Sequence, residues 1–283
     1  MDSDPGGNFS SSAIFKTTVL TVAFTSFYFF KTQKTTFLFK APALKHDPVV
    51  VKKNTPPPVK KKKRTIYLTF DDGPNKGTKN VINIVKKEDI PVTLFVIGEH
   101  VYGSQLQLAM YDSATACNLF EIANHSYTHA FENRYREFYE LPDSVVNDFS
   151  RCADSLHIRS GIIRTPGRNI WRTDSLHCTD IKSSTEAADS LYENGFKAIG
   201  WDLEWHFNNE QRLVQTTDEM LAEIDSAFAK NYTKTCDHLV LLAHDQVYIR
   251  PEDSASLHNF IIQLKKRDIY NFEQVSKYPG VQQ

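Results

Sequence analysis

Residues 65–272 alternate between short apolar runs of strand character and segments with the hydrophobic period of an α-helix. Alternation of this kind is typical of parallel strands covered by helices. With a short final run at 271–275, the pattern predicts an α/β fold, a (β/α) barrel of about seven parallel strands. The strand candidates are 65–70, 91–98, 118–124, 161–165, 196–205 and 238–244, and the helix candidates lie near 78–88, 103–115, 141–157, 185–194, 216–230 and 253–267.

The composition is that of one globular domain with an unusual N-terminal extension. Of 283 residues, 41% are hydrophobic and 12% aromatic, which is enough to bury a sizeable core. Residues 1–64 contain 12 Lys and Arg against 3 Asp and Glu, whereas residues 65–283 contain 21 against 31. The acidic balance of the folded part argues against nucleic acid as a partner. We therefore expect one globular domain over residues 65–283.

The N-terminal extension begins with a hydrophobic region, residues 1–39. Within it, residues 17–30 carry no charge and are flanked by Lys16 and Lys31. These 14 residues are few for a membrane-spanning helix, which needs roughly 17–25, but residues 35–39 extend the run if the intervening lysines reach the interface. The region predicts a transmembrane signal anchor, with a cleaved signal peptide as one alternative and a misplaced start or a buried strand as the other.

A linker rich in Pro and Lys follows, over residues 40–64. It cannot build a core, so we expect a semi-extended spacer. Its basic run either contacts anionic lipid or an anionic wall polymer, or is merely solvated. Together with the anchor, the linker predicts a membrane-bound protein whose folded domain lies outside the cytoplasm, at the periplasm or cell surface. Cleavage of the signal would make it a secreted protein.

The four cysteines show neither a CxxC pair nor the spacing of a zinc site. In an exported protein they are either buried thiols or members of one or two disulfides. Their spacing does not determine a pairing. They are Cys117, Cys152, Cys178 and Cys236.

Polar residues stand where the predicted strands end, the place where (β/α) barrels carry their catalytic groups. Asp71 and Asp72 follow the first strand in TFDDGP, and His125 and His129 follow the third in NHSYTH. Taken alone, Asp-Asp-Gly-Pro is usually just a turn, and a lone HxxxH is more often coincidence. Two histidines four apart in a helical turn share a face, and zinc accepts imidazole nitrogen and carboxylate oxygen. We therefore predict Asp72, His125 and His129 as metal ligands, and Asp71 as the base that deprotonates a bound water.

Two further candidate residues stand late in, or at the end of, other predicted strands, so we expect them on the same rim of the barrel. Arg164 lies late in the fourth strand and His244 ends the sixth. In isolation they would be a salt-bridge arginine and a capping or core histidine. Beside Asp71, however, a guanidinium would keep that carboxylate ionised and oriented. Near a bound amide, His244 would act as the acid that protonates the departing amine.

The order of these motifs resembles the polysaccharide deacetylase family, which includes chitin and peptidoglycan N-acetylglucosamine deacetylases. The matching motifs are TFDDGP, HSYTH, RTPG, WDLEW and LLAHD, and PVTLFVIG resembles the second strand of the family. The resemblance runs from about residue 65 to about residue 272 and implies a distorted (β/α) barrel. It also implies a divalent metal, usually Zn²⁺, although Co²⁺ and other ions are sometimes accepted. Carried over, the roles are Asp71 as base, Asp72, His125 and His129 as ligands, Arg164 as the partner of Asp71, and His244 as acid.

In the third motif the chain departs from the family pattern. The family commonly has an aromatic residue after the proline, whereas this chain has Gly167. One wall of the acetyl pocket is therefore missing, and Trp171 or Trp205 is expected to replace it. The backbone N–H of Gly167 can still stabilise an oxyanion, since that role needs no side chain.

The fourth motif departs as well, because it usually has a carboxylate directly before a tryptophan. Glu204 precedes Trp205 here with a longer acid and a shortened spacing, and Asp202 lies on the same strand face. We favour Glu204 over Asp202 as the residue that orients His244. Either is otherwise a plain rim carboxylate. Trp201 and Leu203 are expected to face the other way and pack.

These residues, together with the family resemblance, predict a metal-dependent hydrolase that removes N-acetyl groups from an amino-sugar polymer and releases acetate. Peptidoglycan, chitin-like oligomers and other exopolysaccharides all remain open as substrates. One alternative is an O-acetyl esterase acting on a polysaccharide. Another is a carbohydrate-binding wall protein that has lost turnover, although all five chemically required side chains are present.

Overall fold

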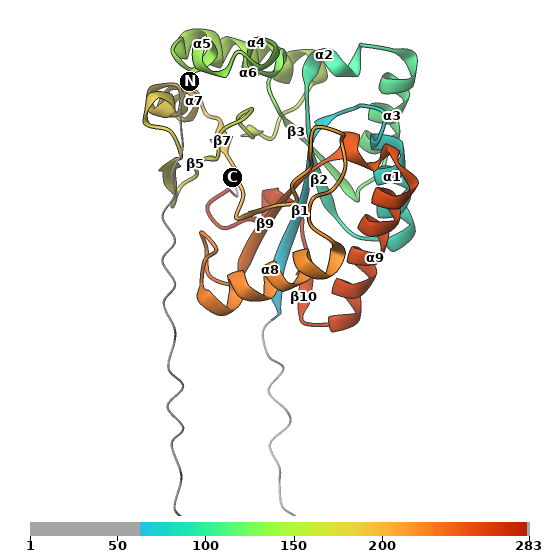
Figure 1. Cartoon of the computed structure of the whole chain (residues 1–283). Coiled ribbons are helices and arrows are strands. Elements are labelled where there is room, and N and C mark those ends of the chain that lie inside the picture. Colours follow the sequence, from blue (N-terminus) through green and yellow to red (C-terminus); the bar gives the residue numbers. More distant parts are fainter. Residues whose placement is uncertain (1–62, 282–283) are drawn as a thin grey trace, which may run out of the picture. The chain divides into compact units, whose positions relative to one another are not determined.

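The computed structural model describes residues 63–281, and Figure 1 shows how their strands and helices are arranged. The predicted segment 1–39 and nearly all of the predicted linker 40–64 lie outside the described residues. Ten strands form one sheet in the order β6-β5-β7-β4-β3-β2-β1-β9-β8, with β10 paired to β1. The strands are β1 (Arg64–Gly73), β2 (Val92–Val96), β3 (Phe120–Asn124), β4 (Ile162–Ile163), β5 (Ile170–Arg172), β6 (His177–Thr179), β7 (Lys197–Ala198), β8 (Leu203–Glu204), β9 (His238–His244) and β10 (Tyr270–Phe272).

The parallel part of this sheet is a distorted barrel. Seven strands pair in parallel from β7 to β8, and these two end strands are joined by residues 199–202 alone. Within that joint, the N–H of Ile199 donates to the carbonyl of Ile163, and the N–H of Asp202 donates to that of Val240. The chain therefore leaves one end of the sheet and arrives at the other. The predicted α/β fold is confirmed, as an incomplete barrel.

Alternation along β1 separates the two sides of the sheet. Ile66, Leu68 and Phe70 pack in the core beneath the outer helices, whereas Tyr67 belongs to the core inside the barrel. Because side chains alternate along a strand, the inward row of β1 ends at Asp71. Both faces of β1 are covered, which explains its nearly continuous apolar sequence.

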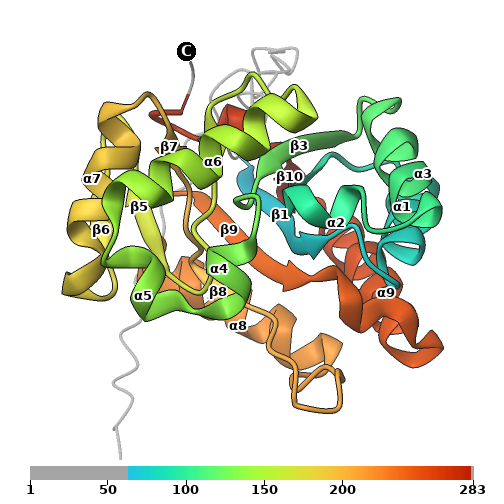
Figure 2. The same ribbon diagram turned by 90° about the horizontal axis from the view of Figure 1, so that it is seen from above.

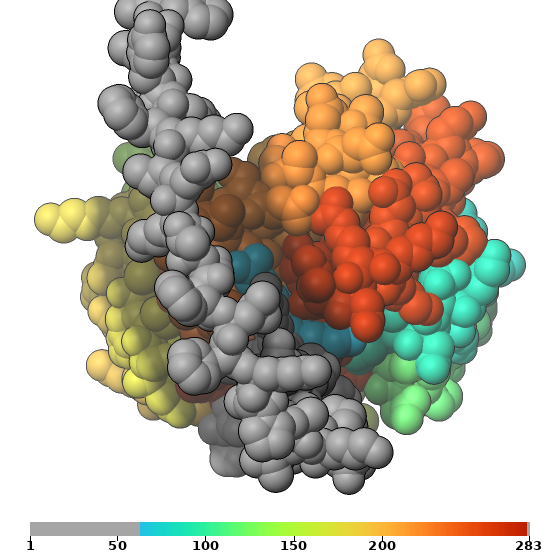
Figure 3. All heavy atoms as spheres, turned by 90° about the horizontal axis from the view of Figure 1, so that it is seen from below, coloured from blue at the N-terminus to red at the C-terminus, as the bar shows by residue number. Residues whose placement is uncertain are grey.

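Helices cover the outside of the sheet. The outer core unites α1, α3, α8 and α9 with the strands, and a second core lies beneath α5, α6 and α7. Figure 2 shows this ring of helices from above, and Figure 3 shows α8 and α9 side by side on the lower face. Among residues 63–281, each helix is too short or too polar to span a membrane. The helices are α1 (Thr78–Glu88), α2 (Gly98–Val101), α3 (Gln105–Thr115), α4 (His129–Asn133), α5 (Tyr135–Tyr139), α6 (Pro142–Leu156), α7 (Thr185–Glu193), α8 (Thr217–Lys230) and α9 (Pro251–Arg267), with short 3₁₀ turns at Lys182–Ser184, Asp245–Ile249 and Val275–Lys277.

The sequence signals that bound α8 show why the predicted helices form where they do. Thr216 and Glu219 make a reciprocal capping box at its start. At its end, Asn231 adopts the left-handed conformation that closes many helices. Between these ends, Met220 and Ile224 lie on the buried face. All six predicted helices occur within two residues of their predicted bounds.

The predicted strand 196–205 is wrong as a single element, since it is divided into β7 and β8. At the break, the side chain of Asn169 takes the place of a neighbouring strand. Its Nδ2 donates to the carbonyl of Trp201, and its Oδ1 accepts from the N–H of the same residue. A Cβ at Gly200 would lie 2.1 Å from Asn169 Oδ1, so the approach depends on glycine. The antiparallel pair β5–β6 and the short helices α2, α4 and α5 were not predicted.

All four cysteines are free thiols, which excludes the disulfide alternative for the described domain. Cys152 is buried, and burial raises the pKa of its thiol to about 12. The others are partly or fully exposed.

Candidate active site

The predicted site residues gather at the carboxyl ends of parallel strands, on one rim of the barrel. In the register of β1 with β9, Asp71 stands opposite His244. The last paired residues of β3 and β4 likewise place His125 beside Arg164. Strand register therefore brings together residues that are up to 173 positions apart in the chain.

Three ligand atoms converge at this rim. Oδ1 of Asp72 lies 3.4 Å from Nε2 of His125 and 3.2 Å from Nε2 of His129. The three atoms all lie within 4.8 Å of one another. Nδ1 of His125 is 2.9 Å from the carbonyl oxygen of Arg164. With its proton on Nδ1, the ring donates a hydrogen bond to this carbonyl and directs the lone pair of Nε2 towards the site. Two imidazole nitrogens and a carboxylate oxygen are a donor set that suits zinc and similar divalent ions.

The backbone around Asp72 presents its carboxylate to the histidines. The pairing of β1 with β2 shifts between Asp71 and Gly73, and Asp72 has φ of +73°. Adjacent carboxylates therefore point in different directions. His100 holds the turn through Nδ1, which lies 2.9 Å from the carbonyl of Asp72. On the carboxylate itself, Oδ2 accepts from Nε2 of Gln246 at 3.3 Å.

The other oxygen of Asp72, Oδ1, is buried and makes no hydrogen bond within residues 63–281. Burial by itself would raise the pKa of Asp72, but the two ligand histidines hold it well below its usual range. The carboxylate is therefore ionised. A buried anionic oxygen that faces two imidazoles is what a bound cation would require, so the residues fit a divalent metal.

His129 reaches the site by a route that differs from the predicted helical turn. Ser126 has φ of +65°, and all five residues of α4 have φ between +51° and +71°. The segment is thus a left-handed turn, and such residues cost roughly 1–2 kcal/mol each. Asp148 supports its entry by accepting from the backbone and hydroxyl of Thr128. The expectation of a shared face on a right-handed helix was wrong, although the two imidazoles do converge.

Asp71 and Arg164 form a buried ion pair next to the ligands. Nη1 of Arg164 donates to Oδ1 of Asp71 at 2.8 Å, while Nε and Nη2 donate to the carbonyls of Ile199 and Gly200. The arginine is fully buried and Asp71 is 2% exposed. Because Oδ1 is engaged, Oδ2 of Asp71 is the oxygen that faces the ligands, 3.7 Å from Nε2 of His125.

His244 ends β9, the strand next to β1, and has fewer supports than Asp71. Its ring meets Phe207 edge to face at a centroid distance of 5.0 Å. Its Nδ1 is buried without a hydrogen-bond partner in the described part of the chain. The expected hydrogen bond from His244 to the Glu204 carboxylate is not formed. Oε1 of Glu204 lies 3.4 Å from Nδ1 of His206 instead.

Asp202, the alternative support for His244, points away from the site. Its two carboxylate oxygens accept from the backbone N–H groups of Val240 and Lys234, at 2.8 and 2.7 Å. Burial raises the pKa of Asp202 to about 6, against the lowering effect of these donors. The residue fastens the strand break to β9, so the expectation that it faces the site was wrong.

The site opens into a hollow of about 400 Å³, here called the active-site pocket. The expected positions of the tryptophans relative to this pocket were wrong. Trp205 and Trp171 are fully buried in the core, and Trp201, expected to pack away, lines the pocket. The lining comprises Asp71, Asp72, His125, His129, Asn133, Tyr135, Gly167, Trp201, Glu204, Phe207, Leu242 and His244.

Tyr135 occupies the space beside Gly167 that a side chain would need. A Cβ at Gly167, where φ is +62°, would lie 2.8 Å from Cε1 of Tyr135. The tyrosine ring also meets His129 edge to face at 6.0 Å. The wall missing from the third motif is therefore supplied by α5, from a residue that precedes the motif by some thirty positions.

Sequence reasoning missed several lining residues. Leu242 could have been found, because it is two positions before His244 on the same strand and must share its inward face. Asn133 and Phe207 stand in left-handed or irregular segments, and Tyr135 begins α5, a short helix that was not predicted. No periodic signal marks residues of that kind.

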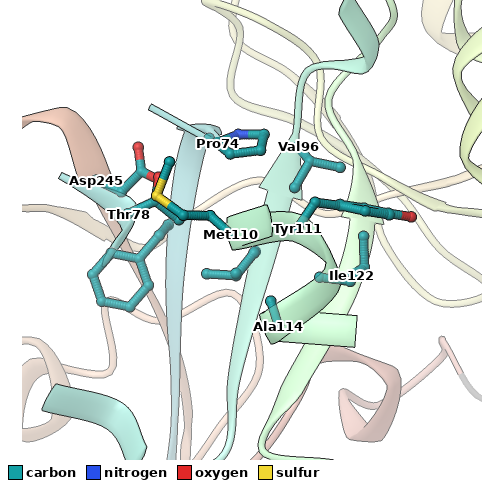
Figure 4. A pocket seen from close by; sticks show the side chains of 11 residues that line it. Pro74, Thr78, Val96, Met110, Tyr111, Ala114, Ile122 and Asp245 are labelled. Atoms are coloured by element: carbon teal, nitrogen blue, oxygen red, sulfur yellow. The ribbon is translucent and has the colours of Figure 1, made fainter. Parts of the chain in front are cut away.

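A small apolar cavity of about 10 Å³ lies behind the rim, between β1, β2 and α3 (Figure 4). Asp245 closes one end and accepts hydrogen bonds from Thr78 Oγ1 and Asn75 Nδ2. Burial raises the pKa of Asp245 to about 8. These contacts fasten the loop that follows Asp72 to the end of β9. Asp245 directly follows His244, yet its position in the sequence gave no hint of this role.

Both the sequence and the fold are similar to those of known polysaccharide deacetylases. The sequence profile of the family described as polysaccharide deacetylase matches residues 59–162. A peptidoglycan-N-acetylglucosamine deacetylase of Bacillus cereus is 28% identical over 214 residues, which are 74% of this chain and 68% of that protein. A chitooligosaccharide deacetylase of Bradyrhizobium is 30% identical over 157 residues, 54% of this chain and 64% of its own length.

Among solved structures, a polysaccharide deacetylase from Bacillus cereus has the same fold, with a TM-score of 0.52 and 25% identity. The match covers 77% of this chain and 94% of that one. The resemblance to the polysaccharide deacetylase family that the motifs predicted is thereby confirmed.

Proposed function

We propose that this protein hydrolyses the acetamide of an N-acetylated amino-sugar polymer and releases acetate, with the help of a divalent metal for which Zn²⁺ is our assignment. The observation that carries the proposal is the convergence of Asp72, His125 and His129 around a buried carboxylate oxygen that lacks a hydrogen bond. The names of the matched relatives support the substrate class.

Asp72, His125 and His129 would hold the metal. A divalent ion in such a set polarises a carbonyl and lowers the pKa of a bound water. Oδ2 of Asp71 would take the proton from the attacking water, and Arg164 keeps the Asp71 carboxylate ionised and oriented through Oδ1.

His244, which stands beside Asp71 at the end of the neighbouring strand β9, then gives a proton to the sugar nitrogen as the C–N bond breaks. The backbone N–H of Gly167, in the pocket wall, is the donor we assign to the developing oxyanion. Trp201 and Leu242 provide apolar surface beside these groups.

Hydrolysis of O-acetyl esters is the second candidate, and one observation favours it. No carboxylate supports His244 among residues 63–281, and an alkoxide leaves with less help from an acid than an amine does. The two candidate reactions therefore differ in how strongly they depend on proton donation by His244.

The test is acetate release from N-acetylglucosamine oligomers and from O-acetylated xylan, with metal-loaded and chelator-treated protein. Metal-dependent release from the oligomers supports the proposal. Release from xylan alone selects the ester candidate, and release from neither refutes both.

For the rest of the chain the proposal relies on sequence alone. We propose that residues 1–39 anchor the protein in a membrane, or direct its secretion if cleaved, and that residues 40–64 space a monomeric catalytic domain of residues 65–283 from it. Fractionation of cells that express the full chain, with an antibody to the catalytic domain, tests this. Recovery in the soluble cytoplasmic fraction would refute it.

A further inference from the structure

A second hollow adjoins the active-site pocket and shares part of its wall. Asn133 and Tyr135 line both. The second hollow measures about 640 Å³ and is here called the arginine hollow. A polymer whose N-acetyl group sits in the pocket must place neighbouring groups over such adjoining surfaces. Its lining consists of Asn133, Arg134, Tyr135, Arg136, Glu137, Glu140 and Arg168.

The charges of the arginine hollow do not balance. Arg134 pairs with Glu137 and Arg136 with Glu140, each at 3.0 Å. Arg168 forms no ion pair with a carboxylate of the described residues. Residues 63–281 as a whole contain 31 acidic against 23 basic side chains. An unpaired cation beside the pocket therefore has the opposite sign to the net charge of the domain.

Arg168 is held in place by uncharged contacts. Its guanidinium carbon lies 5.7 Å from the ring centroid of Tyr135 and 5.5 Å from that of Tyr139. Nη1 donates to the carbonyl of Gly167 at 2.7 Å. The hydroxyl of Tyr139 donates to the carbonyl of Pro166, which fixes the same turn. The side chain is therefore positioned before any ligand arrives, at the residue next to the pocket wall.

The donors of Arg168 are largely unused. A guanidinium has five N–H donors in a planar fork. In Arg168 one of them is bonded within the described residues, and Nε is buried without a partner. The fork matches a carboxylate in shape and charge, whereas a neutral hydroxyl would leave the charge uncompensated.

We propose that Arg168 binds a carboxylate on the polysaccharide, so that the protein prefers an acidic amino-sugar polymer over a neutral one. This inference rests on the proposed function and narrows its substrate. The carboxylate belongs to the reacting sugar or to its neighbour. The lactyl group of a muramic acid and the carboxyl of a uronic acid share this chemistry.

Matched pairs of substrates test the inference with the full-length protein. The first pair is an oligomer of N-acetylglucosamine alternating with N-acetylmuramic acid, and the same oligomer with its carboxylates amidated. The second pair alternates N-acetylglucosamine with glucuronic acid, and uses its carboxyl-reduced form as the partner. The quantity measured is the ratio of kcat/KM for acid over neutral substrate, from acetate release.

For the wild-type protein we expect a ratio of about ten or more in at least one pair, carried mainly by KM, since hydrogen bonds to charged groups are worth about that factor. The pair that shows it identifies the source of the carboxylate. Arg168→Gln should bring that ratio close to one, and Arg168→Lys should restore part of it. The matched control is Arg134→Gln, which removes an exposed and already paired arginine from the same hollow and should keep the wild-type ratio.

A wild-type ratio near one in both pairs would overturn the inference and leave the deacetylase proposal standing. A ratio that survives in Arg168→Gln would overturn it as well. If no substrate releases acetate, the proposed function fails, and the inference is then decided by binding. NMR titration with N-acetylmuramic acid and N-acetylglucosamine should show tighter binding of the acid to the wild type and equal binding to Arg168→Gln; equal binding to the wild type contradicts the inference.

Discussion

The two sides of the active-site pocket are built differently. On the side of β1, β3 and β4, Asp71 and Arg164 are buried and joined by a direct ion pair, and His125 is fixed through its second ring nitrogen. On the side of β8 and β9, Nδ1 of His244 lacks a partner and Glu204 turns to His206. The first side, here called the ordered side, is held in its geometry by contacts within the protein. On the second side, here called the open side, the position of His244 depends more on contacts with a bound substrate.

The largest effect should come from the ordered side. Asp71→Asn removes the proposed base while keeping its shape, so acetate release should fall by roughly 10²–10⁴. Metal content should change little, because Asp71 is not among the three converging ligands. Rates and bound metal should be measured on the same sample. A variant that retains more than a tenth of wild-type activity would contradict the role.

Stability should also depend on the ordered side. Arg164→Leu leaves a buried carboxylate unpaired and should lower the free energy of unfolding by about 3–5 kcal/mol. Arg136→Leu is the matched control, since its ion pair with Glu140 is exposed, and should cost at most about 1 kcal/mol. Urea unfolding of both variants measures the difference. Equal losses would remove the contrast between buried and exposed pairs.

Kinetics on two substrates sharpen the contrast with the open side. His244→Ala should slow amide hydrolysis by about 10²-fold or more and ester hydrolysis by clearly less, because the amine needs the proton. Glu204→Gln should change amide hydrolysis by no more than a few fold, as Glu204 does not contact His244. A loss in Glu204→Gln as large as that in His244→Ala would show that the two act together in the working enzyme.

The smallest effect concerns the outer wall of the ordered side. Gly167→Ala should cost about 1–2 kcal/mol for its left-handed backbone, plus the contact with Tyr135. Gly195→Ala is the control, because Gly195 has φ of +85° and its added Cβ would meet nothing within 4 Å. The excess loss in Gly167→Ala over Gly195→Ala, from urea unfolding, measures the contact. Equal losses would mean that Tyr135 moves aside freely.

Regular periodicity predicts much of this molecule. The bounds of α1 and β9 follow from it directly, as do the inward positions of Asp71 and His244. What it could not predict lies where the backbone leaves regular geometry. Trp201 and Glu204 both line the pocket although they are three residues apart, because the strand that carries them is broken.

Tertiary contacts explain the remaining differences. The break between β7 and β8 depends on Asn169, which lies more than thirty residues before Trp201. The left-handed turn that carries His129 depends on contacts such as those of Asp148. No local propensity in either segment indicates these partners. Asp72, His125 and His129 were nevertheless predicted, because residue type and order along the sequence, rather than local conformation, indicated them.

The most direct measurement is calorimetric titration of metal-free protein with Zn²⁺ at pH 8, supported by X-ray absorption of the complex. Burial alone would lower the pKa of His125, but the neighbouring Asp71 and Asp72 raise it. At an alkaline pH a larger fraction of this imidazole is neutral, so the metal displaces fewer protons when it binds. The account predicts one tightly bound ion per chain with two imidazoles in its shell, lost in His125→Ala and kept in His206→Ala. Tight binding that survives His125→Ala, or no tight binding at all, would contradict it.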